Sequence, residues 1–211
     1  MSQSILLATN NEAKILRFRK LLEHAAPDIT LLTPKEADLP SKDIEETGQT
    51  LTENATLKAQ AYASSTDFPI LANDTGFWVH GEGFILAPKR TALLNQHPST
   101  NLSQTEIAQA MLAFWKGVAQ KHGGRVDATW IESFVILHPD GTLHCVESRR
   151  ELLLTDQEFG QSHPDMPLRA LYISKATGKP ALNHTESEEL LEMRPVMDAL
   201  VALIETLPRS L

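Results

Sequence analysis

The sequence predicts an α/β fold with a mixed β-sheet and helices packed against it. Three observations support this class. Short apolar runs alternate with amphipathic helical patterns, two strand patterns flank the turn sequence HPDG, and three segments have the capping-box spacing that opens helices. Strands in β-α-β order and strands in a hairpin together require parallel and antiparallel neighbours. The 211 residues suit one domain, 1–211, or two closely packed lobes.

The first elements alternate between strand and helix. An apolar run, SILLA, is broken by the polar residues TNN, and the helical stretch that follows carries its apolar residues on one face. Pro34 stops the next strand, and the segment after it has the composition of a loop. The predicted elements are a strand at 4–8, a helix at 12–24, a strand at 29–33 and a loop at 34–49.

The rest of the chain continues the alternation and adds a hairpin. Capping boxes at 50–53, 103–106 and 185–188 mark helix starts, and Pro195 suits the first turn of a last helix. The remaining predictions are strands at 68–72, 129–137, 142–147 and 168–173, and a final helix from Pro195 to about residue 207.

The charge and the apolar pattern exclude several classes of function. Lysine and arginine total 19 against 27 acidic residues, which gives a net charge of −8. Nucleic acids and anionic membranes require basic surface, so we expect neither as a partner. No apolar run approaches the roughly 18 residues that span a bilayer, and the N-terminus has no signal-peptide pattern. The single cysteine rules out an intrachain disulfide, which fits a cytoplasmic protein.

The segment SILLATNNEAK, residues 4–14, has the pattern of an anion-binding turn. It places a short polar turn between a strand and a helix start, where free backbone N–H groups and the positive helix end face the turn. Thr9 and Asn11 can add side-chain donors, and Lys14 a full positive charge. In the alternative interpretation, Asn11 only caps the helix and Lys14 is solvated.

The segment IEETGQTLTENATLKA, residues 44–59, combines an acidic loop with a helix start. Glu45 and Glu46 precede Gly48, so one of the two can face inward. Asn54 and Lys58 are four residues apart and therefore share a helix face. The alternative is an acidic loop beside a solvated helix edge.

The segment ILANDTGFWV, residues 70–79, follows an apolar strand with a carboxylate and a glycine. Mg²⁺ is usually held by one or two carboxylates with phosphates and water, and Asp74 and Glu46 are candidates. Such a carboxylate can also orient or deprotonate an attacking water. The alternative is a turn in which Asp74 bonds local backbone N–H groups and Gly76 supplies a positive φ.

These three segments, in this order and at similar separations, resemble the N-terminal signatures of the inosine triphosphate pyrophosphatase family. The resemblance covers about the first 80 residues. It implies Mg²⁺-dependent hydrolysis of nucleoside triphosphates such as ITP and XTP to the monophosphate and pyrophosphate. It also implies an elongated mixed sheet flanked by helices, two lobes with a central cleft, and usually a homodimer.

The resemblance assigns roles to matching positions of this sequence. Asp74 would bind metal and act as the general base, and Glu46 would bind Mg²⁺, with Glu45 a weaker candidate. Glu53 would add to the acidic lining of the cleft. The residues implied in substrate binding are Thr9, Asn10, Asn11, Lys14, Asn54, Lys58, Thr75 and Arg194.

The sequence departs from the family pattern mainly after residue 80. The family usually has two aspartates at the third motif, and here the first is Asn73. Its final serine-histidine-arginine motif is matched only by Arg194, since the histidine position holds Met193. Loss of the first aspartate should weaken metal binding or alter the number of metals. The groups that differ after residue 80 are those that grip the purine base, so we expect the phosphate chemistry to be preserved better than the base preference.

Two other functions remain open from the sequence. One is a Maf-type pyrophosphatase, which shares this general architecture and acts on other nucleotides. The other is a nucleotide-binding or scaffold protein that has lost catalysis. Retention of Lys14, Glu46 and Asp74 favours an active enzyme.

Overall fold

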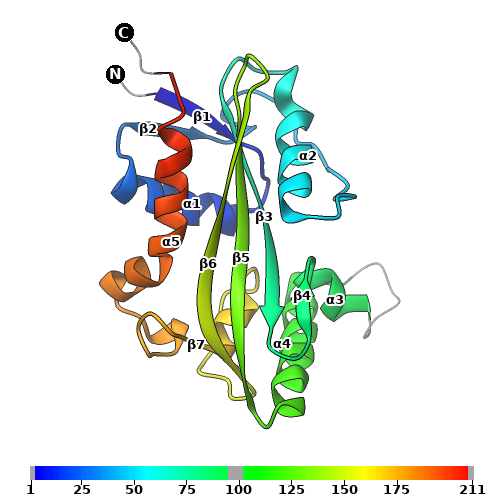
Figure 1. Ribbon diagram of the computed structural model, residues 1–211. Coiled ribbons are helices and arrows are strands. Elements are labelled where there is room, and N and C mark those ends of the chain that lie inside the picture. The colour runs from blue at the N-terminus through cyan, green and yellow to red at the C-terminus, as the bar shows by residue number, and fades with distance from the viewer. Residues whose placement is uncertain (1–2, 95–101, 209–211) are drawn as a thin grey trace. The chain divides into compact units, whose positions relative to one another are not determined.

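A computed structural model of the protein describes residues 3–94 and 102–208 (Figure 1). Its helices are α1 (Glu12–Ala25), α2 (Leu51–Ala63), α3 (Pro88–Leu94), α4 (Gln104–Lys121) and α5 (Glu186–Ile204). Its strands are β1 (Gln3–Leu7), β2 (Ile29–Leu32), β3 (Ile70–Val79), β4 (Gly83–Ile85), β5 (Arg125–Leu137), β6 (Leu143–Thr155) and β7 (Tyr172–Ser174). Two 3₁₀ helices, Pro167–Leu171 and Ala181–Asn183, precede α5.

The strands form one mixed sheet in the order β2-β1-β3-β5-β6-β7, with β4 paired to β3. β1 runs parallel to β2 and β3, whereas β4 is antiparallel to β3 and β7 is antiparallel to β6. This arrangement confirms the predicted fold class. The chain also divides into two compact units, and each is described here by itself. Unit 1 comprises residues 1–75, 132–148 and 194–211, and unit 2 comprises residues 76–131 and 149–193.

In unit 1, helices α1 and α2 cover opposite faces of the sheet (Figure 1). Ala55 and Ala59 of α2 pack in one core cluster with Ile70 of β3 and Val135 of β5. The neighbouring residue of β5, Phe134, instead contacts Phe18 of α1, with ring centroids 6.0 Å apart. Successive strand residues point to opposite faces, so each helix is matched by its own set of apolar strand positions.

In unit 2, the core lies against α4. Trp115 is fully buried and meets the ring of Phe77 edge-on, with centroids 5.1 Å apart. Ser103 caps this helix in the predicted reciprocal box with Glu106. The helix therefore begins where the sequence indicated, and it buries a stripe centred on Met111 and Trp115.

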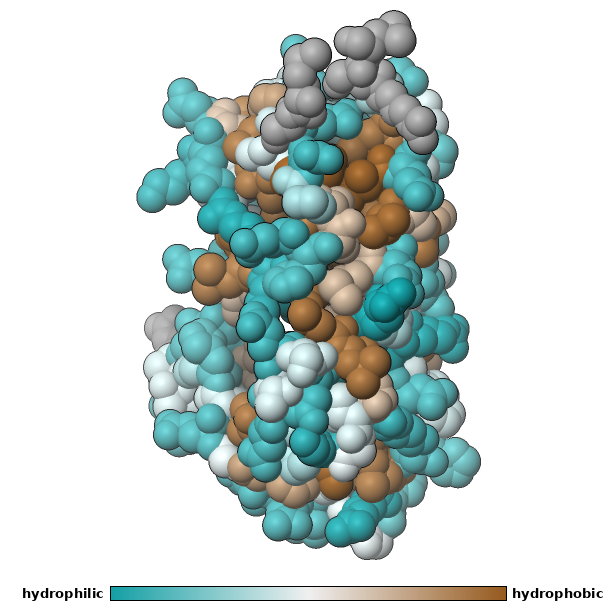
Figure 2. All heavy atoms as spheres, turned by 90° about the vertical axis from the view of Figure 1, so that its left-hand side faces the viewer, coloured by the Kyte–Doolittle hydropathy of each residue, from teal (hydrophilic) through white to brown (hydrophobic). Residues whose placement is uncertain are grey.

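The outer surface carries isolated apolar side chains among polar ones. Figure 2 shows one face of the molecule, on which hydrophilic side chains predominate and hydrophobic ones lie between them. Leu16, Leu94 and Leu191 are more than half exposed, as single residues of soluble proteins often are. Among the described residues, none of the helices has the length and apolar character needed to cross a membrane.

Three predicted elements differ from the structure. Strand β3 does not end at Ala72 but continues through the ANDTG segment to Val79. Pro195 lies inside α5 and does not begin a new helix, so the last helix starts at the third capping segment. The strand expected at 168–173 is mostly the 3₁₀ helix Pro167–Leu171, followed by the short strand β7.

Candidate functional site

The central residues of the site are Asn73 and Asp74, which are adjacent on β3 and both buried. Because neighbouring strand residues face opposite sides of the sheet, their side chains meet different helices. Asn73 accepts a hydrogen bond from Lys14 of α1, and Asp74 contacts Asn54 and Lys58 of α2. The alternative of a turn with a positive φ at Gly76 is wrong, because the segment is extended strand.

The carboxylate of Asp74 is held at both oxygens. Lys58 Nζ donates to Oδ1 at 2.8 Å, and Asn54 Nδ2 donates to Oδ2 at 3.2 Å. The same ammonium contacts Glu46 Oε1 at 2.7 Å and the backbone carbonyl of Asn73 at 3.2 Å. Glu46 and Asp74 therefore face one cation, the ammonium of Lys58.

The start of α2 fixes Asn54 for this contact. Thr50 caps the helix by accepting from the backbone N–H of Glu53, and Asn54 Oδ1 accepts from the backbone N–H of Gly48 at 2.8 Å. A Cβ on Gly48 would lie 2.7 Å from that amide oxygen, so only glycine fits there. Glu53 accepts a hydrogen bond from the backbone N–H of Gln49 and so stabilises the helix start.

Lys14 approaches Asn73 from the other face of the sheet. Asn11 caps α1 by accepting from the backbone N–H of Lys14, and the Lys14 ammonium lies 3.3 Å from Asn73 Oδ1. Burial lowers the pKa of Lys14 to about 8, the positive charges of Lys58 and Arg17 act in the same direction, and the negative charges of Asp74 and Glu132 oppose them more weakly. Nearby cations that repel one another in this way favour an anion among them.

A buried ion pair beside Asn73 escaped the sequence analysis. Glu132 of β5 is fully buried and accepts from both terminal nitrogens of Arg17, at 3.2 and 2.6 Å. Its Oε2 also accepts from Asn73 Nδ2 at 3.3 Å. The available signal was a glutamate inside the apolar strand WIESFVIL, since an acidic residue there needs a partner.

The other predicted substrate-binding residues make the following contacts. Thr9 Oγ1 accepts from the backbone N–H of Asn11, and Thr75 Oγ1 accepts from Asn73 Nδ2. Asn10 donates to the Lys42 carbonyl. It also lines a cavity of about 430 Å³ with the residues Pro34, Lys35, Asp38, Leu39, Pro40 and Ser41.

Arg194 is a predicted substrate-binding residue whose ion pair lies with Asp198 of its own helix. Its side chain is 70% exposed on α5, and its guanidinium pairs with Asp198 one turn further along. Met193, at the histidine position of the resembled motif, is buried. Among the described residues, the side chain of Arg194 has no hydrogen bond or ion pair with Lys14, Glu46 or Asp74.

The donor set of the site fits a hard divalent cation completed by its ligand. No three or more His, Cys, Asp or Glu side chains of the described residues are grouped so as to hold a metal alone. Glu46 and Asp74 nevertheless lie close enough together for both carboxylates to contact the ammonium of Lys58. Two carboxylates with substrate phosphates and water are the usual environment of Mg²⁺.

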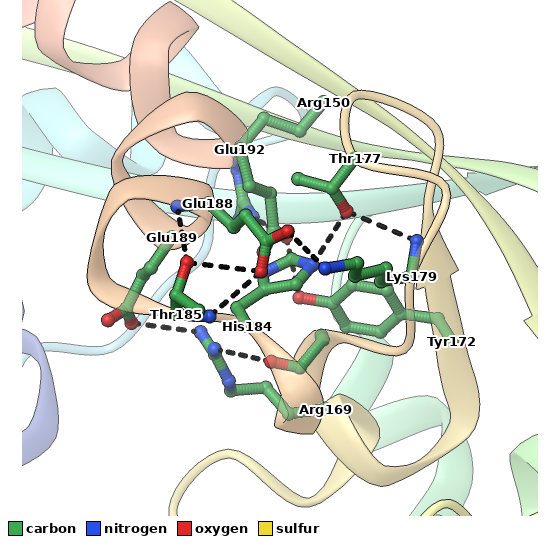
Figure 3. Close-up of polar contacts among 11 residues, drawn as sticks. Arg150, Arg169, Tyr172, Thr177, Lys179, His184, Thr185, Glu188, Glu189 and Glu192 are labelled. Carbon is green, nitrogen blue, oxygen red and sulfur yellow. Dashed lines mark hydrogen bonds and ion pairs between the residues drawn. The ribbon is translucent and has the colours of Figure 1, made fainter.

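Unit 2 contains a second cluster of buried polar groups, shown in Figure 3. Glu192 Oε1 accepts from Tyr172 Oη at 2.8 Å and from Arg150 Nη1 at 3.0 Å. His184 Nδ1 lies 3.2 Å from Glu192 Oε2, and His184 Nε2 lies 2.7 Å from Thr177 Oγ1. Burial and the charge of Glu192 raise the pKa of Tyr172, so the phenol stays protonated. This cluster ties the first turns of α5 to β7.

Comparison with known proteins gives a consistent assignment. The profile of the Ham1 family matches residues 5–149. The dITP/XTP pyrophosphatase of Symbiobacterium thermophilum is 43% identical over 84 residues, which are 39% of this chain and 40% of that protein. The protein of the same name from Cutibacterium acnes is 41% identical over 76 residues, 36% of each chain. The match thus spans about two fifths of these curated relatives.

Solved structures agree on the fold over nearly the whole chain. The Ham1 protein of Staphylococcus aureus superposes with a TM-score of 0.70 at 22% identity, covering 96% of this chain and 98% of that one. The HAM1 protein of Coxiella burnetii gives a TM-score of 0.70 at 20% identity, covering 97% and 100%. Since the family profile matches more than half of the sequence, as the three N-terminal motifs predicted, this chain belongs to the Ham1 family.

Proposed function

We propose that the protein is a Mg²⁺-dependent nucleoside triphosphate pyrophosphatase that produces a nucleoside monophosphate and pyrophosphate. The observation that carries the proposal is the meeting of Lys14, Lys58, Glu46 and Asp74 around residue 73 of β3. The names of the curated relatives, dITP/XTP pyrophosphatase, support the same reaction class. We further propose that the protein works in the cytoplasm as a homodimer.

In this proposal the cations of the site bind the phosphate chain. Lys14 offers an ammonium whose hydrogen-bond partner is a neutral amide, and the repulsion by Lys58 and Arg17 outweighs the attraction of Asp74 and Glu132, which favours a phosphate oxygen beside it. The backbone N–H groups at the start of α1, next to Thr9, Asn10 and Asn11, add the positive end of the helix. Thr75 contributes a hydroxyl beside Asn73.

Asp74 is the proposed general base. Asn54 and Lys58 fix its carboxylate, so that an oxygen lone pair can accept a proton from the water that attacks the α-phosphorus. Glu46 and Asp74 would hold Mg²⁺, which when bound offsets the negative charge that develops on the phosphate oxygens. Pyrophosphate then leaves, and the proton is carried by Asp74 until it passes to solvent.

The altered C-terminal half supports a change of base preference. The arginine proposed to contact substrate, Arg194, is exposed and paired with Asp198, and the neighbouring Met193 offers no hydrogen bond. Loss of a donor that reads a base carbonyl removes about one or more kcal/mol of discrimination. We therefore expect comparable pyrophosphate release from ITP, XTP and other triphosphates. Strong selectivity for ITP and XTP would contradict this part of the proposal.

Replacing Asp74 by Asn tests the assigned base. The amide keeps the size of the side chain but cannot accept a proton, so we expect turnover to fall by about 10²–10⁴-fold. The measurement is pyrophosphate release in the presence of Mg²⁺, with circular dichroism to confirm the fold. The matched control is Asp140→Asn, an exposed hairpin-turn residue that bonds a backbone N–H, and it should keep full activity. An Asp74→Asn variant with undiminished turnover would show that another group is the base.

The same assay separates the other two functions. A pyrimidine or modified nucleotide that outperforms all purine triphosphates would favour the Maf-type activity. A wild-type protein that binds triphosphates but releases no pyrophosphate would favour a nucleotide-binding protein without catalysis. Sedimentation equilibrium measures the proposed dimer directly.

A further inference from the structure

The side-chain amide of Asn73 lies between two groups of opposite charge. Its Nδ2 donates to the carboxylate of Glu132, and its Oδ1 accepts from the ammonium of Lys14, each at 3.3 Å. A carboxylate only accepts and an ammonium only donates, so a flipped amide would place like groups against each other at both ends. Glu132 and Lys14 thus allow a single orientation of Asn73.

Most charged side chains around Asn73 are paired with a side chain of opposite charge, and Lys14 is the exception among those described in this paragraph. Arg17 and Glu132 form a bidentate pair in which the carboxylate is fully buried, so their charges offset each other. Lys58 lies between Glu46 and Asp74. The ammonium of Lys14, in contrast, contacts the neutral oxygen of Asn73. An aspartate at position 73 would neutralise Lys14 and would also face Glu132 as a second buried carboxylate.

We propose that Glu132 is a positioning residue of the phosphate site: through the amide of Asn73 it holds the Lys14 ammonium in place and leaves its positive charge for the ligand. This inference rests on the proposed function, because it takes a phosphate chain as the ligand of Lys14. Arg17 completes the arrangement by pairing with Glu132 at 2.6 Å. The attraction of Glu132 for Lys14 is therefore weaker than the repulsion of Lys14 by Lys58 and by Arg17 itself.

A purely structural ion pair predicts a different behaviour. Replacing a buried ion pair by apolar residues of similar volume is often neutral or stabilising, so the pair need not be kept for stability alone. If Glu132 only filled the core, its removal together with Arg17 would not affect ligand binding. If Glu132 orients Asn73, removing the pair lets the amide rotate, so the Lys14 ammonium is held less firmly and ligand affinity falls.

The first experiment replaces the pair by Arg17→Met with Glu132→Leu, which leaves the net charge unchanged. The probe is inorganic triphosphate with Mg²⁺, titrated by calorimetry, since this ligand has no base and needs no turnover. We expect an unfolding midpoint at or above that of the wild type and an affinity about tenfold weaker. An unchanged affinity would overturn the proposal.

Unit 2 offers the matched control. Arg150 and Glu192 are likewise a buried arginine–glutamate pair, with side chains 7% and 3% exposed (Figure 3). The double variant Arg150→Met with Glu192→Leu makes the same chemical change outside the phosphate site. We expect it to bind triphosphate as tightly as the wild type. If the control lost as much affinity, the effect would come from a general disturbance of the fold, and the proposal would be overturned.

A second pair of variants separates positioning from stability. Asn73→Asp alone puts two carboxylates in contact, so we expect it to lower the unfolding midpoint and to weaken triphosphate binding. Adding Glu132→Gln removes that contact and restores the net charge, so the midpoint should return towards the wild-type value. Affinity should remain about tenfold weaker, because the introduced carboxylate would still neutralise Lys14. Recovery of affinity together with stability would contradict the inference.

These measurements also distinguish the inference from the proposed function. A wild-type protein that binds triphosphate but releases no pyrophosphate would refute the pyrophosphatase assignment and leave the role of Glu132 intact. A wild-type protein that does not bind triphosphate would overturn the inference itself.

Discussion

Lys14 should destabilise the folded protein at neutral pH, so replacing it by methionine should stabilise the fold. Burial, with the nearby charges of Lys58 and Arg17, lowers the pKa of Lys14 from 10.5 to about 8. At about 1.36 kcal/mol per pKa unit, this corresponds to about 3 kcal/mol for the charged form. Because Lys14 as a residue keeps part of its surface exposed to solvent, we discount this to about 2 kcal/mol, and the lost bond to Asn73 subtracts about 1 kcal/mol. We therefore expect Lys14→Met to gain about 1 kcal/mol.

The gain should depend on pH with a defined sign. The pKa of Lys14 is lower in the folded protein than in the unfolded chain, so between pH 8 and 10.5 the unfolded chain binds more protons at this position. The free energy of unfolding of the wild type therefore rises through this window from the contribution of Lys14. The advantage of the methionine variant is full below pH 8 and shrinks as the pH rises through the window. Near pH 10.5 only the lost bond to Asn73 remains, so the variant should there be about 1 kcal/mol less stable than the wild type.

Urea unfolding at pH 7 and at pH 10 measures both effects. Lys35→Met, at an exposed lysine of the loop after β2, is the control and should change the free energy of unfolding by less than about 0.5 kcal/mol. A Lys14→Met variant that is less stable than the wild type at pH 7, with an unchanged pH dependence, would refute the reasoning.

Three further substitutions test the packing. Phe134→Ala empties a fully buried position and should cost about 3–5 kcal/mol in denaturant unfolding. Ser103→Ala removes the cap of α4 and should cost about 1 kcal/mol in thermal unfolding. Gly76→Ala places a Cβ 2.7 Å from the ring of Phe84 and should cost about 1–3 kcal/mol, which Phe84→Ala should partly recover because that ring is 48% exposed. No recovery in that pair would show that the backbone, and not the ring, resists the methyl group.

The sequence predicted the elements whose signals are local. Capping residues and apolar spacing placed the starts of α1, α2 and α4, and the HPDG turn placed the hairpin of β5 and β6. It failed where distant contacts decide the structure. Asn73 and Asp74 have the composition of a turn, yet partners on α1 and α2 satisfy their side chains inside a strand.

The candidate site shows the same division. The motifs identified Lys14, Glu46 and Asp74, because each lies in a segment with a recognisable pattern. Glu132 could not be paired with Arg17 from the sequence, because 115 positions separate them and no spacing rule connects a strand residue to a helix so far away. The position of Pro195 was predicted wrongly for a related reason. A proline often begins a helix, but here α5 continues on both sides of Pro195.

The parallel pairing of β3 with β1 sets Leu6 opposite Ile70 and Leu7 opposite Leu71. A slip of this pairing by a single position would turn every side chain of the strand over. The amide of Asn73 would then face α2 and the carboxylate of Asp74 would face α1, so that Lys58 would meet a neutral group and Lys14 a charged one. The register of β3 against β1 therefore decides which lysine each of the two side chains meets, although the residues of the strand stay the same.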